Sequence, residues 1–166
     1  MRSQNRFRRA HSKIKSLAAL ARVAHRAKSL GRTVVITNGC FDLLHAGHVK
    51  LLERAKRQGD LLIVALNSDR SVKALKGARR PVVTHRDRAL LLAALESVDY
   101  VTIFNELTPS RVVARLRPDV LIKGADWGAS QIVGREIVER SGGKVVRVPL
   151  LKGHSTSQLI ERVKSL

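Results

Sequence analysis

Residues 33–57 read TVVITNGCFDLLHAGHVKLLERAKR, and this stretch decides the fold. Residues 33–37 form an apolar run without alternation, which is typical of a strand that is buried on both faces of a parallel sheet. A short loop follows, and apolar residues then return at helical spacing over residues 47–57. The stretch therefore predicts a strand, a loop and a helix, the first unit of an α/β fold.

The same order repeats along the rest of the chain. Four further short runs are rich in Val, Ile and Leu, at residues 61–66, 100–104, 120–123 and 144–148. Helical patterns cover residues 86–96, 109–116, 130–141 and 155–164. This alternation predicts a single Rossmann-like, doubly wound α/β domain with a five-stranded parallel sheet and right-handed crossovers. In such sheets, ligands bind beyond the carboxyl ends of the strands.

The N-terminal part divides into two segments before this domain. Residues 1–12 are basic and polar, and we expect them to be disordered. Residues 13–31 are expected to hold an N-terminal helix, with Ser16 as its N-cap and Gly31 at its end. The domain proper then covers residues 32–166.

Composition places the chain among soluble globular proteins. Its 166 residues are 44% hydrophobic, which suits one domain with a core. The longest apolar runs, residues 61–66 and 89–95, are far shorter than the roughly 18 residues of a membrane span. No secretory signal is recognisable, and the single cysteine permits no internal disulfide. We therefore expect a cytoplasmic protein without a membrane partner.

The net charge of +19 indicates an anionic partner. Residues 1–32 contain ten Lys or Arg and no acidic residue, so 19 − 10 leaves +9 for the remainder. Charge alone does not separate nucleic acid from a phosphorylated small molecule. A nucleic-acid-binding module is the less favoured of the two, because three Phe, one Trp and one Tyr are too few for a stacking platform and no zinc-finger or RNA-binding signature is present.

The pair His45 and His48 lies between the first strand and the next helix, with Gly47 between them. A helix N-terminus offers unpaired N–H groups to a phosphate, and a glycine lets the backbone approach it closely. Two imidazoles there could stabilise charge on phosphate oxygens. The alternatives are a chance pair and a zinc site, which would need Cys40, His85 or His154 to supply further ligands.

A basic tract follows the second predicted strand and comprises Arg70, Lys73, Lys76, Arg79, Arg80, Arg86 and Arg88. Such a tract is often only a solvated surface. Its place after the carboxyl end of a strand brings Lys73, Lys76 and Arg88 within reach of a polyphosphate.

Two later stretches also follow strands. Residues 153–157, Gly-His-Ser-Thr-Ser, precede the last helix, where Ser155 is either a simple N-cap or part of a phosphate cradle. Residues 123–127, Lys-Gly-Ala-Asp-Trp, end the fourth strand either as an ordinary turn or as a ligand-facing loop. Cys40 lacks a partner base in the sequence and is better explained as a small buried thiol than as a nucleophile.

Together these motifs resemble the cytidylyltransferase-like nucleotidyltransferases, over about residues 33–164. Within that family the chain is most similar to D-glycero-β-D-manno-heptose 1-phosphate adenylyltransferases, the C-terminal domain of bifunctional ADP-heptose synthases. Further pieces carry this resemblance: residues 75–77 (Leu-Lys-Gly), 80–82 (Arg-Pro-Val), 95–100 (Leu-Glu-Ser-Val-Asp-Tyr), 123–127 and 132–134 (Ile-Val-Gly). Glycerol-3-phosphate cytidylyltransferase is the alternative, but that family has an arginine where Glu96 stands and another where Leu150 stands.

The resemblance implies that residues 32–166 are a nucleotidyltransferase domain that transfers AMP from ATP to the sugar 1-phosphate, giving ADP-heptose, a lipopolysaccharide core precursor, and pyrophosphate. It implies Mg²⁺ bound with ATP, a homodimer, and a separate heptose kinase, because only a basic helix precedes the core. Catalytic roles are carried over to His45, His48, Lys73 and Lys76. Nucleotide-binding roles are carried over to Gly39, Cys40, Phe41, Asp69, Arg88, Lys123, Asp126, Ser155 and Thr156, with Asp42 as a possible metal-positioning residue.

Overall fold

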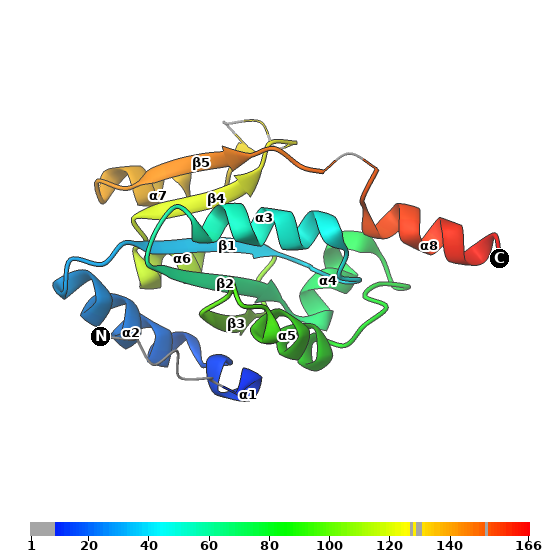
Figure 1. Cartoon of the computed structure of the whole chain (residues 1–166), viewed down its shortest axis with the longest axis horizontal. Coiled ribbons are helices and arrows are strands. Elements are labelled where there is room, and N and C mark those ends of the chain that lie inside the picture. The colour runs from blue at the N-terminus through cyan, green and yellow to red at the C-terminus, as the bar shows by residue number, and fades with distance from the viewer. Residues whose placement is uncertain (1–8, 127, 129–130, 152) are drawn as a thin grey trace, which may run out of the picture.

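A computed structural model of the chain describes residues 9–126, 128, 131–151 and 153–166. Its centre is a parallel sheet in which all five strands run the same way (Figure 1), in the order β3-β2-β1-β4-β5. The strands are β1 Val34–Gly39, β2 Leu61–Asn67, β3 Tyr100–Phe104, β4 Val120–Gly124 and β5 Lys144–Val148. The strand order reverses between β1 and β4, so the predicted doubly wound sheet is confirmed, and the crevice for a ligand falls at the carboxyl ends of these strands.

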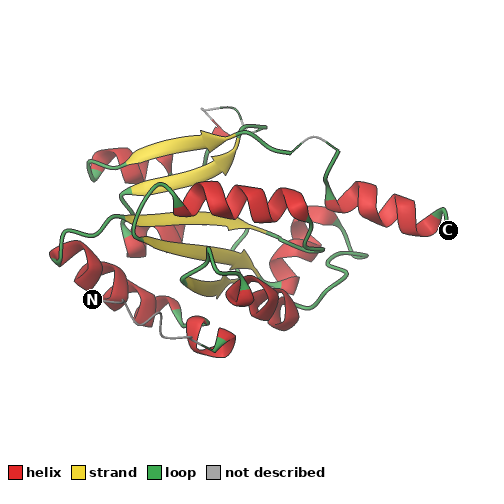
Figure 2. Ribbon diagram, in the orientation of Figure 1, coloured by secondary structure: helices red, strands yellow, loops and turns green. Residues whose placement is uncertain are grey.

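Helices cover both faces of the sheet (Figure 2). They are α1 Ala10–Lys13, α2 Leu17–Ser29, α3 Ala46–Lys56, α4 Asp69–Lys76, α5 His85–Ala94, α6 Ser110–Leu116, α7 Arg135–Arg140 and α8 Thr156–Lys164.

The side chains of β1 show why its first three residues are all apolar. Val34 and Ile36 pack in one core cluster with residues of α2, α6 and α7, whereas Val35 packs in a second cluster with residues of α3 and α5. Successive residues of a strand point to opposite faces, so a central strand with helices on both faces needs apolar residues at every position. β2, which is buried along its whole length, follows the same rule.

The predicted helices are confirmed to within two residues at their ends for α3, α5, α6 and α8. α7 is shorter than expected, because Gly134 adopts a left-handed conformation with φ of 93° and the helix begins only after it. Ser130, where this helix was expected to begin, lies outside the described residues. α4 was not predicted, because it has only eight residues, of which Val72, Ala74 and Leu75 alone are apolar, and its charged side chains stood out instead as part of the basic tract.

The N-terminal segment is tied to the domain. Ser16 caps α2 as predicted, because its side chain accepts a hydrogen bond from the backbone N–H of Ala19 at 3.3 Å. Residues 10–12, within the stretch expected to be disordered, belong to α1. At the end of α1, Lys13 Nζ donates to the carbonyl oxygens of Leu95 and Val98 at 3.1 and 2.9 Å. Residues 1–8 lie outside the described part of the chain.

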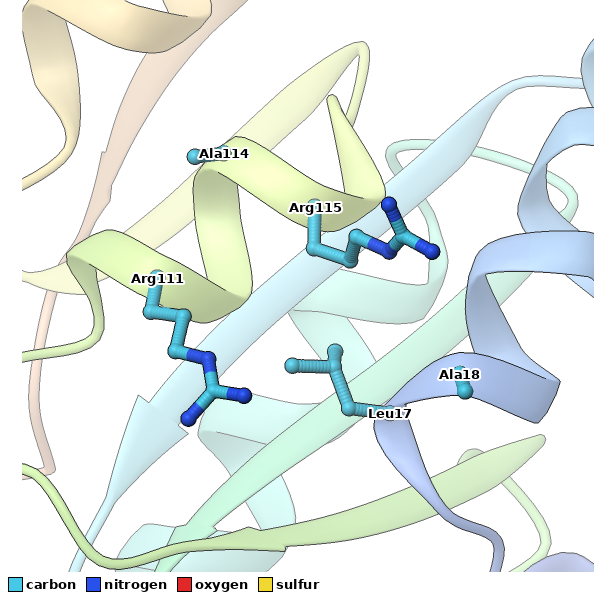
Figure 3. A pocket seen from close by; sticks show the side chains of 5 residues that line it. All are labelled: Leu17, Ala18, Arg111, Ala114 and Arg115. Carbon is cyan, nitrogen blue, oxygen red and sulfur yellow. The ribbon is translucent and has the colours of Figure 1, made fainter.

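A cavity of about 500 Å³ opens between α2 and α6 (Figure 3). Its lining residues are Leu17, Ala18, Arg111, Ala114 and Arg115, none of which was predicted to bind a ligand. Arg111 is engaged with Glu106, at 2.9 Å between Nη1 and Oε1. The polar groups that can perform chemistry gather instead at the carboxyl edge of the sheet.

The last helix, α8, lies at the surface of the domain. α8 projects away from the sheet (Figure 1), and none of its residues, all of which the structure describes, is buried. Among the described residues, no helix has both the length and the apolar character that crossing a membrane requires.

Candidate active site

The two predicted histidines stack on each other where β1 meets α3. His45 is the N-cap residue of α3, with extended backbone, and His48 lies in the first turn. Their ring centroids are 3.8 Å apart, and the ring planes differ by 21°. The structure thus brings both imidazoles to the carboxyl edge of β1, beside the N-terminal end of α3, where backbone N–H groups and the helix dipole favour an anion.

Gly47 makes this stacking possible. A Cβ atom at Gly47 would lie 2.9 Å from both Cε1 and Nδ1 of His45 and 3.2 Å from Cβ of His154. His154 precedes α8, and its ring centroid is 6.4 Å from that of His45. The glycine therefore permits the close approach of three segments: the loop after β1, the first turn of α3 and the segment before α8.

Burial keeps the histidine pair neutral. It lowers the pKa of His48 to about 4, with a further decrease from neighbouring His45 and a partial increase from a hydrogen bond to the backbone of Leu43. The pKa of His45 is also lowered, first by burial and then by His154. The Nδ1 atoms of both rings are buried and have no hydrogen-bond partner among the described residues. Two neutral imidazoles with unused ring nitrogens can accept protons when an anion enters.

The loop that leads into the pair places backbone rather than side chains at the site. Phe41 is buried in a left-handed conformation with φ of 44°, and its ring packs 5.1 Å from that of His48. Burial raises the pKa of the Cys40 thiol, whereas the charges of Lys76, Arg88 and Arg80 lower it. The charge of Asp42 acts in the opposite direction, so the loop at Cys40 lies near three cations and one anion, a net positive charge that favours a bound anion.

The lysines and hydroxyls come from two other segments, α4 and the start of α8. Lys73 and Lys76 are exposed on α4, which starts where β2 ends. The Ser155 hydroxyl accepts a hydrogen bond from the backbone N–H of Gln158 at 3.2 Å, so the N-cap interpretation is correct. Thr156 is the first residue of α8. This cap leaves the remaining first-turn N–H groups of α8 for a ligand.

Lys123 ends β4 with its side chain buried. Burial lowers its pKa to about 8, and the charges of Asp126 and Cys40 act in the opposite direction. Asp126 itself is exposed in the turn that follows. A lysine at this position can donate to a bound anion while losing its charge more easily than a surface lysine. Trp127, the last residue of this motif, lies outside the described residues.

Arg88 differs from its predicted role as a phosphate ligand. Its side chain is fully buried, and its guanidinium donates to three protein groups: the carbonyl oxygen of Val83 at 2.8 Å, that of Cys40, and Asp69 Oδ1 at 2.7 Å. The second oxygen of Asp69 lies 2.9 Å from Nδ1 of His85. Arg88 and Asp69 thus hold the loop around Cys40 in place rather than facing a ligand directly.

Asp42 also differs from its predicted role near a metal. Its buried carboxylate accepts three hydrogen bonds, from Arg80 Nε at 2.5 Å and from the backbone N–H groups of Val82 and Val83 at 2.8 and 3.0 Å. The described residues contain no group of three His, Cys, Asp or Glu side chains that could hold a metal ion. The zinc alternative has no support in this part of the chain.

These features define an α/β fold of the Rossmann-like kind with a stacked histidine pair where the carboxyl edge of the sheet meets a helix N-terminus. The Cytidylyltransferase-like family matches residues 36–162, and the chain belongs to this family.

Known proteins similar to this chain come from two kinds of comparison. The Bifunctional protein HldE of Citrifermentans bemidjiense is 51% identical over 154 residues, which cover 93% of this chain and 32% of that protein. The Bifunctional protein HldE of Bradyrhizobium sp. (strain ORS 278) is 54% identical over 138 residues, 83% of this chain and 28% of that protein. The chain therefore spans about a third of the length of such relatives. A crystal structure of the lipopolysaccharide core biosynthesis protein from Thermoplasma volcanium has a TM-score of 0.60 and 27% identity, and the match covers 75% of this chain and all of that one.

Proposed function

We propose that the protein is an adenylyltransferase that transfers AMP from ATP to D-glycero-β-D-manno-heptose 1-phosphate. The observation that carries this proposal is the stacked pair His45 and His48 at the N-terminal end of α3, within a chain about half identical to bifunctional HldE proteins. The subfamily motifs favour the heptose phosphate over glycerol 3-phosphate, because Glu96 and Leu150 stand where the glycerol-3-phosphate enzymes have arginines.

The proposed reaction is a direct displacement at phosphorus. A phosphate oxygen of the sugar 1-phosphate attacks the α-phosphorus of ATP, and the bond from this phosphorus to the oxygen bridging to the β-phosphate breaks. Pyrophosphate leaves with the electron pair of that bond, so no covalent enzyme intermediate is needed. The protein then acts by positioning both substrates and by stabilising charge on the phosphate oxygens.

The residues divide this work according to where they lie. His45 and His48 face the centre at which negative charge accumulates, and their unused nitrogens can donate hydrogen bonds once the phosphates raise their pKa. Lys73 and Lys76 attract the phosphates from α4. Thr156 and the first turn of α8 hold the distal phosphates, while Lys123 and Asp126 contact nucleotide or sugar from the end of β4.

Magnesium enters this proposal with ATP. Mg²⁺ prefers oxygen ligands and binds phosphates readily with few protein contacts. The described residues provide no metal cage and the carboxylate of Asp42 is engaged by three donors, so the phosphate oxygens would hold the ion. Bound there, it would neutralise part of the charge of the leaving pyrophosphate.

We extend the proposal to a homodimer, and to a kinase activity that supplies the heptose 1-phosphate, on the same polypeptide or another. A dimer would elute from a sizing column with a light-scattering mass of twice 18.3 kDa. A monomeric mass at micromolar concentration would contradict this part of the proposal.

The test of function is a pyrophosphate-release assay that crosses ATP and CTP with heptose 1-phosphate and glycerol 3-phosphate. Only ATP with heptose 1-phosphate should give rapid release. His48→Ala should reduce turnover by about 10²- to 10³-fold, the usual effect of losing one preorganised charge-stabilising donor. Turnover with CTP and glycerol 3-phosphate would instead support the cytidylyltransferase alternative, and undiminished turnover in a folded His48→Ala protein would contradict the role of the pair.

A further inference from the structure

The segment between α4 and α5, residues 77–84, is fastened to the loop after β1 by a buried carboxylate. Asp42 accepts hydrogen bonds from the backbone N–H groups of Val82 and Val83 and from the Arg80 side chain. Only 1% of the Asp42 side chain is exposed. Burying a carboxylate without hydrogen-bond partners costs free energy, so the charge of Asp42 favours the one position of the segment that supplies these partners, beside the loop after β1.

A buried guanidinium fastens the same segment from the other side. Arg88 on α5 donates to the carbonyl oxygen of Val83 and also to that of Cys40. Its third donor group is occupied by Asp69 at the start of α4. The segment 77–84 and the Gly39–Phe41 loop therefore share two buried charged anchors and are positioned as one unit.

Arg80 is arranged differently from Arg88, although both lie in this network. Its Nε atom donates to Asp42 Oδ2 at 2.5 Å, but its two terminal amino groups have no hydrogen-bond partner among the described residues. Its side chain is 19% exposed, whereas that of Arg88 is completely buried. Arg80 is thus oriented through one donor while its paired terminal donors remain unused.

The surroundings of Arg80 favour an anion. The positive charges of Lys76, Arg80 and Arg88 all act on Cys40, so they lie close to the loop that precedes the histidine pair. The carboxylates of Asp42 and Asp69 oppose them, which leaves one unit of positive charge before Lys123 at the end of β4 is added. An excess of cations around partly open donors is the usual composition of a phosphate-binding site.

We propose that Arg80 binds a phosphate group of a bound substrate through its two terminal amino groups, and that Asp42 is the positioning residue that orients it. Guanidinium groups match phosphate oxygens with two parallel hydrogen bonds, a geometry that lysine does not reproduce. The inference deepens the proposed function and rests on it for the identity of the phosphate, which belongs either to ATP or to the sugar 1-phosphate. Nothing in the sequence motifs had assigned Arg80 to the site.

The test compares two neighbouring arginines of equal charge. Arg80→Gln removes the oriented guanidinium, while Arg79→Gln removes the same charge from an exposed side chain that makes no hydrogen bond or ion pair with the described residues. Calorimetry would measure the dissociation constants of inorganic pyrophosphate, ATP and the sugar 1-phosphate. Arg80→Gln should weaken at least one of these by about tenfold or more, as expected for a lost charge-assisted pair of hydrogen bonds. Arg79→Gln should change each less than about threefold.

The set of probes that Arg80→Gln binds more weakly identifies which substrate carries the phosphate that Arg80 contacts. Weaker binding of pyrophosphate and ATP assigns Arg80 to the triphosphate, and weaker binding of the sugar 1-phosphate alone assigns it to the second substrate. Arg80→Lys should restore less than half of the lost binding free energy. Equal effects of the two Gln variants, no effect of either, or binding of no probe by the unmodified protein would overturn the inference.

Asp42→Asn tests the positioning role. The asparagine keeps the size of the side chain and can still accept from the backbone N–H groups, but it removes the charge that faces Arg80. It should raise the same dissociation constant as Arg80→Gln and add little to it in the double variant. Thermal melts accompany each variant, and if Asp42→Asn does not fold, the Arg80 and Arg79 variants alone decide. If the unmodified protein binds pyrophosphate through Arg80 but releases no pyrophosphate in the assay, the proposed function is contradicted while this inference is supported.

Discussion

Acidification should show that His48 stays neutral in the ligand-free protein. An exposed imidazole has a pKa near 6.5 and is about 90% protonated at pH 5.5. With its pKa lowered to about 4 by burial and by His45, His48 should be only about 3% protonated at that pH. The difference amounts to nearly one proton and is large enough to measure at a single residue.

The same shift makes the folded state less stable in acid. Between pH 6.5 and 4, the unfolded chain protonates His48 and the folded chain does not, so the unfolded state gains protons as the pH falls. The contribution of His48 to stability is therefore complete above about pH 6.5 and is lost progressively toward pH 4. Because part of the ring is exposed, we discount the full shift and expect a loss on the order of 2 kcal/mol.

Nuclear magnetic resonance of the imidazole Cε1–H groups, titrated from pH 8 to 4, measures the proton directly. The six histidines are separated by comparison with His48→Gln, which removes one signal. Urea unfolding at pH 7 and pH 5 then compares the unmodified protein with the same variant. The loss of stability between these two pH values should be smaller in His48→Gln.

Added pyrophosphate supplies the second half of this prediction. An anion next to the pair favours the protonated rings, so the apparent pKa of His48 should rise on binding. A His48 signal that titrates between pH 6 and 7 without ligand would refute the reasoning, since it would mean that neither burial nor His45 opposes its charge.

Three further predictions concern other parts of the site. Gly47→Ala should change the free energy of unfolding by less than about 1 kcal/mol, because Ala favours a helix. It should nevertheless lower the rate of pyrophosphate release at least tenfold, because the added methyl displaces the ring of His45. Urea melts and rate assays on one preparation measure the two effects. Pyrophosphate release should fall as the pH rises through about 8, where Lys123 loses its charge, and Lys123→Arg should extend the active range upward. Deleting residues 1–8 should weaken salt-sensitive binding to DNA without changing pyrophosphate release, which a salt titration and the rate assay measure separately.

The sheet could be predicted from the sequence because burial on both faces leaves a strong local signal. β1 and β2 must be apolar at successive positions to fill two cores, and a short apolar run bounded by a loop shows this directly. α4 leaves no such signal. The helix is short and mostly charged, so the sequence predicted a basic tract within reach of a polyphosphate there but no helix.

Some residues of the candidate site could likewise be predicted from the sequence, and others could not. His45, Gly47 and His48 are neighbours in the chain, so the loop and helix that hold them could be predicted from the single stretch of residues 33–57. The buried contacts of Arg88 could not be predicted from adjacent residues in the sequence, because its partners Cys40 and Asp69 lie 48 and 19 residues away. Which cation is enclosed and which stays open depends on long-range packing, and this distinction separates Arg88 from Arg80.

α8 carries Thr156 at its start but buries none of its own side chains, whereas α3 buries Leu52 and Ala55 in the core. Segments with few buried contacts open at a small fraction of the global unfolding free energy. Backbone amides of α8 should accordingly exchange their hydrogens with solvent much sooner than those of α3. His154, just before α8, lies next to His45, so a polyphosphate that contacted both α3 and the start of α8 should slow the hydrogen exchange of α8 more than that of α3.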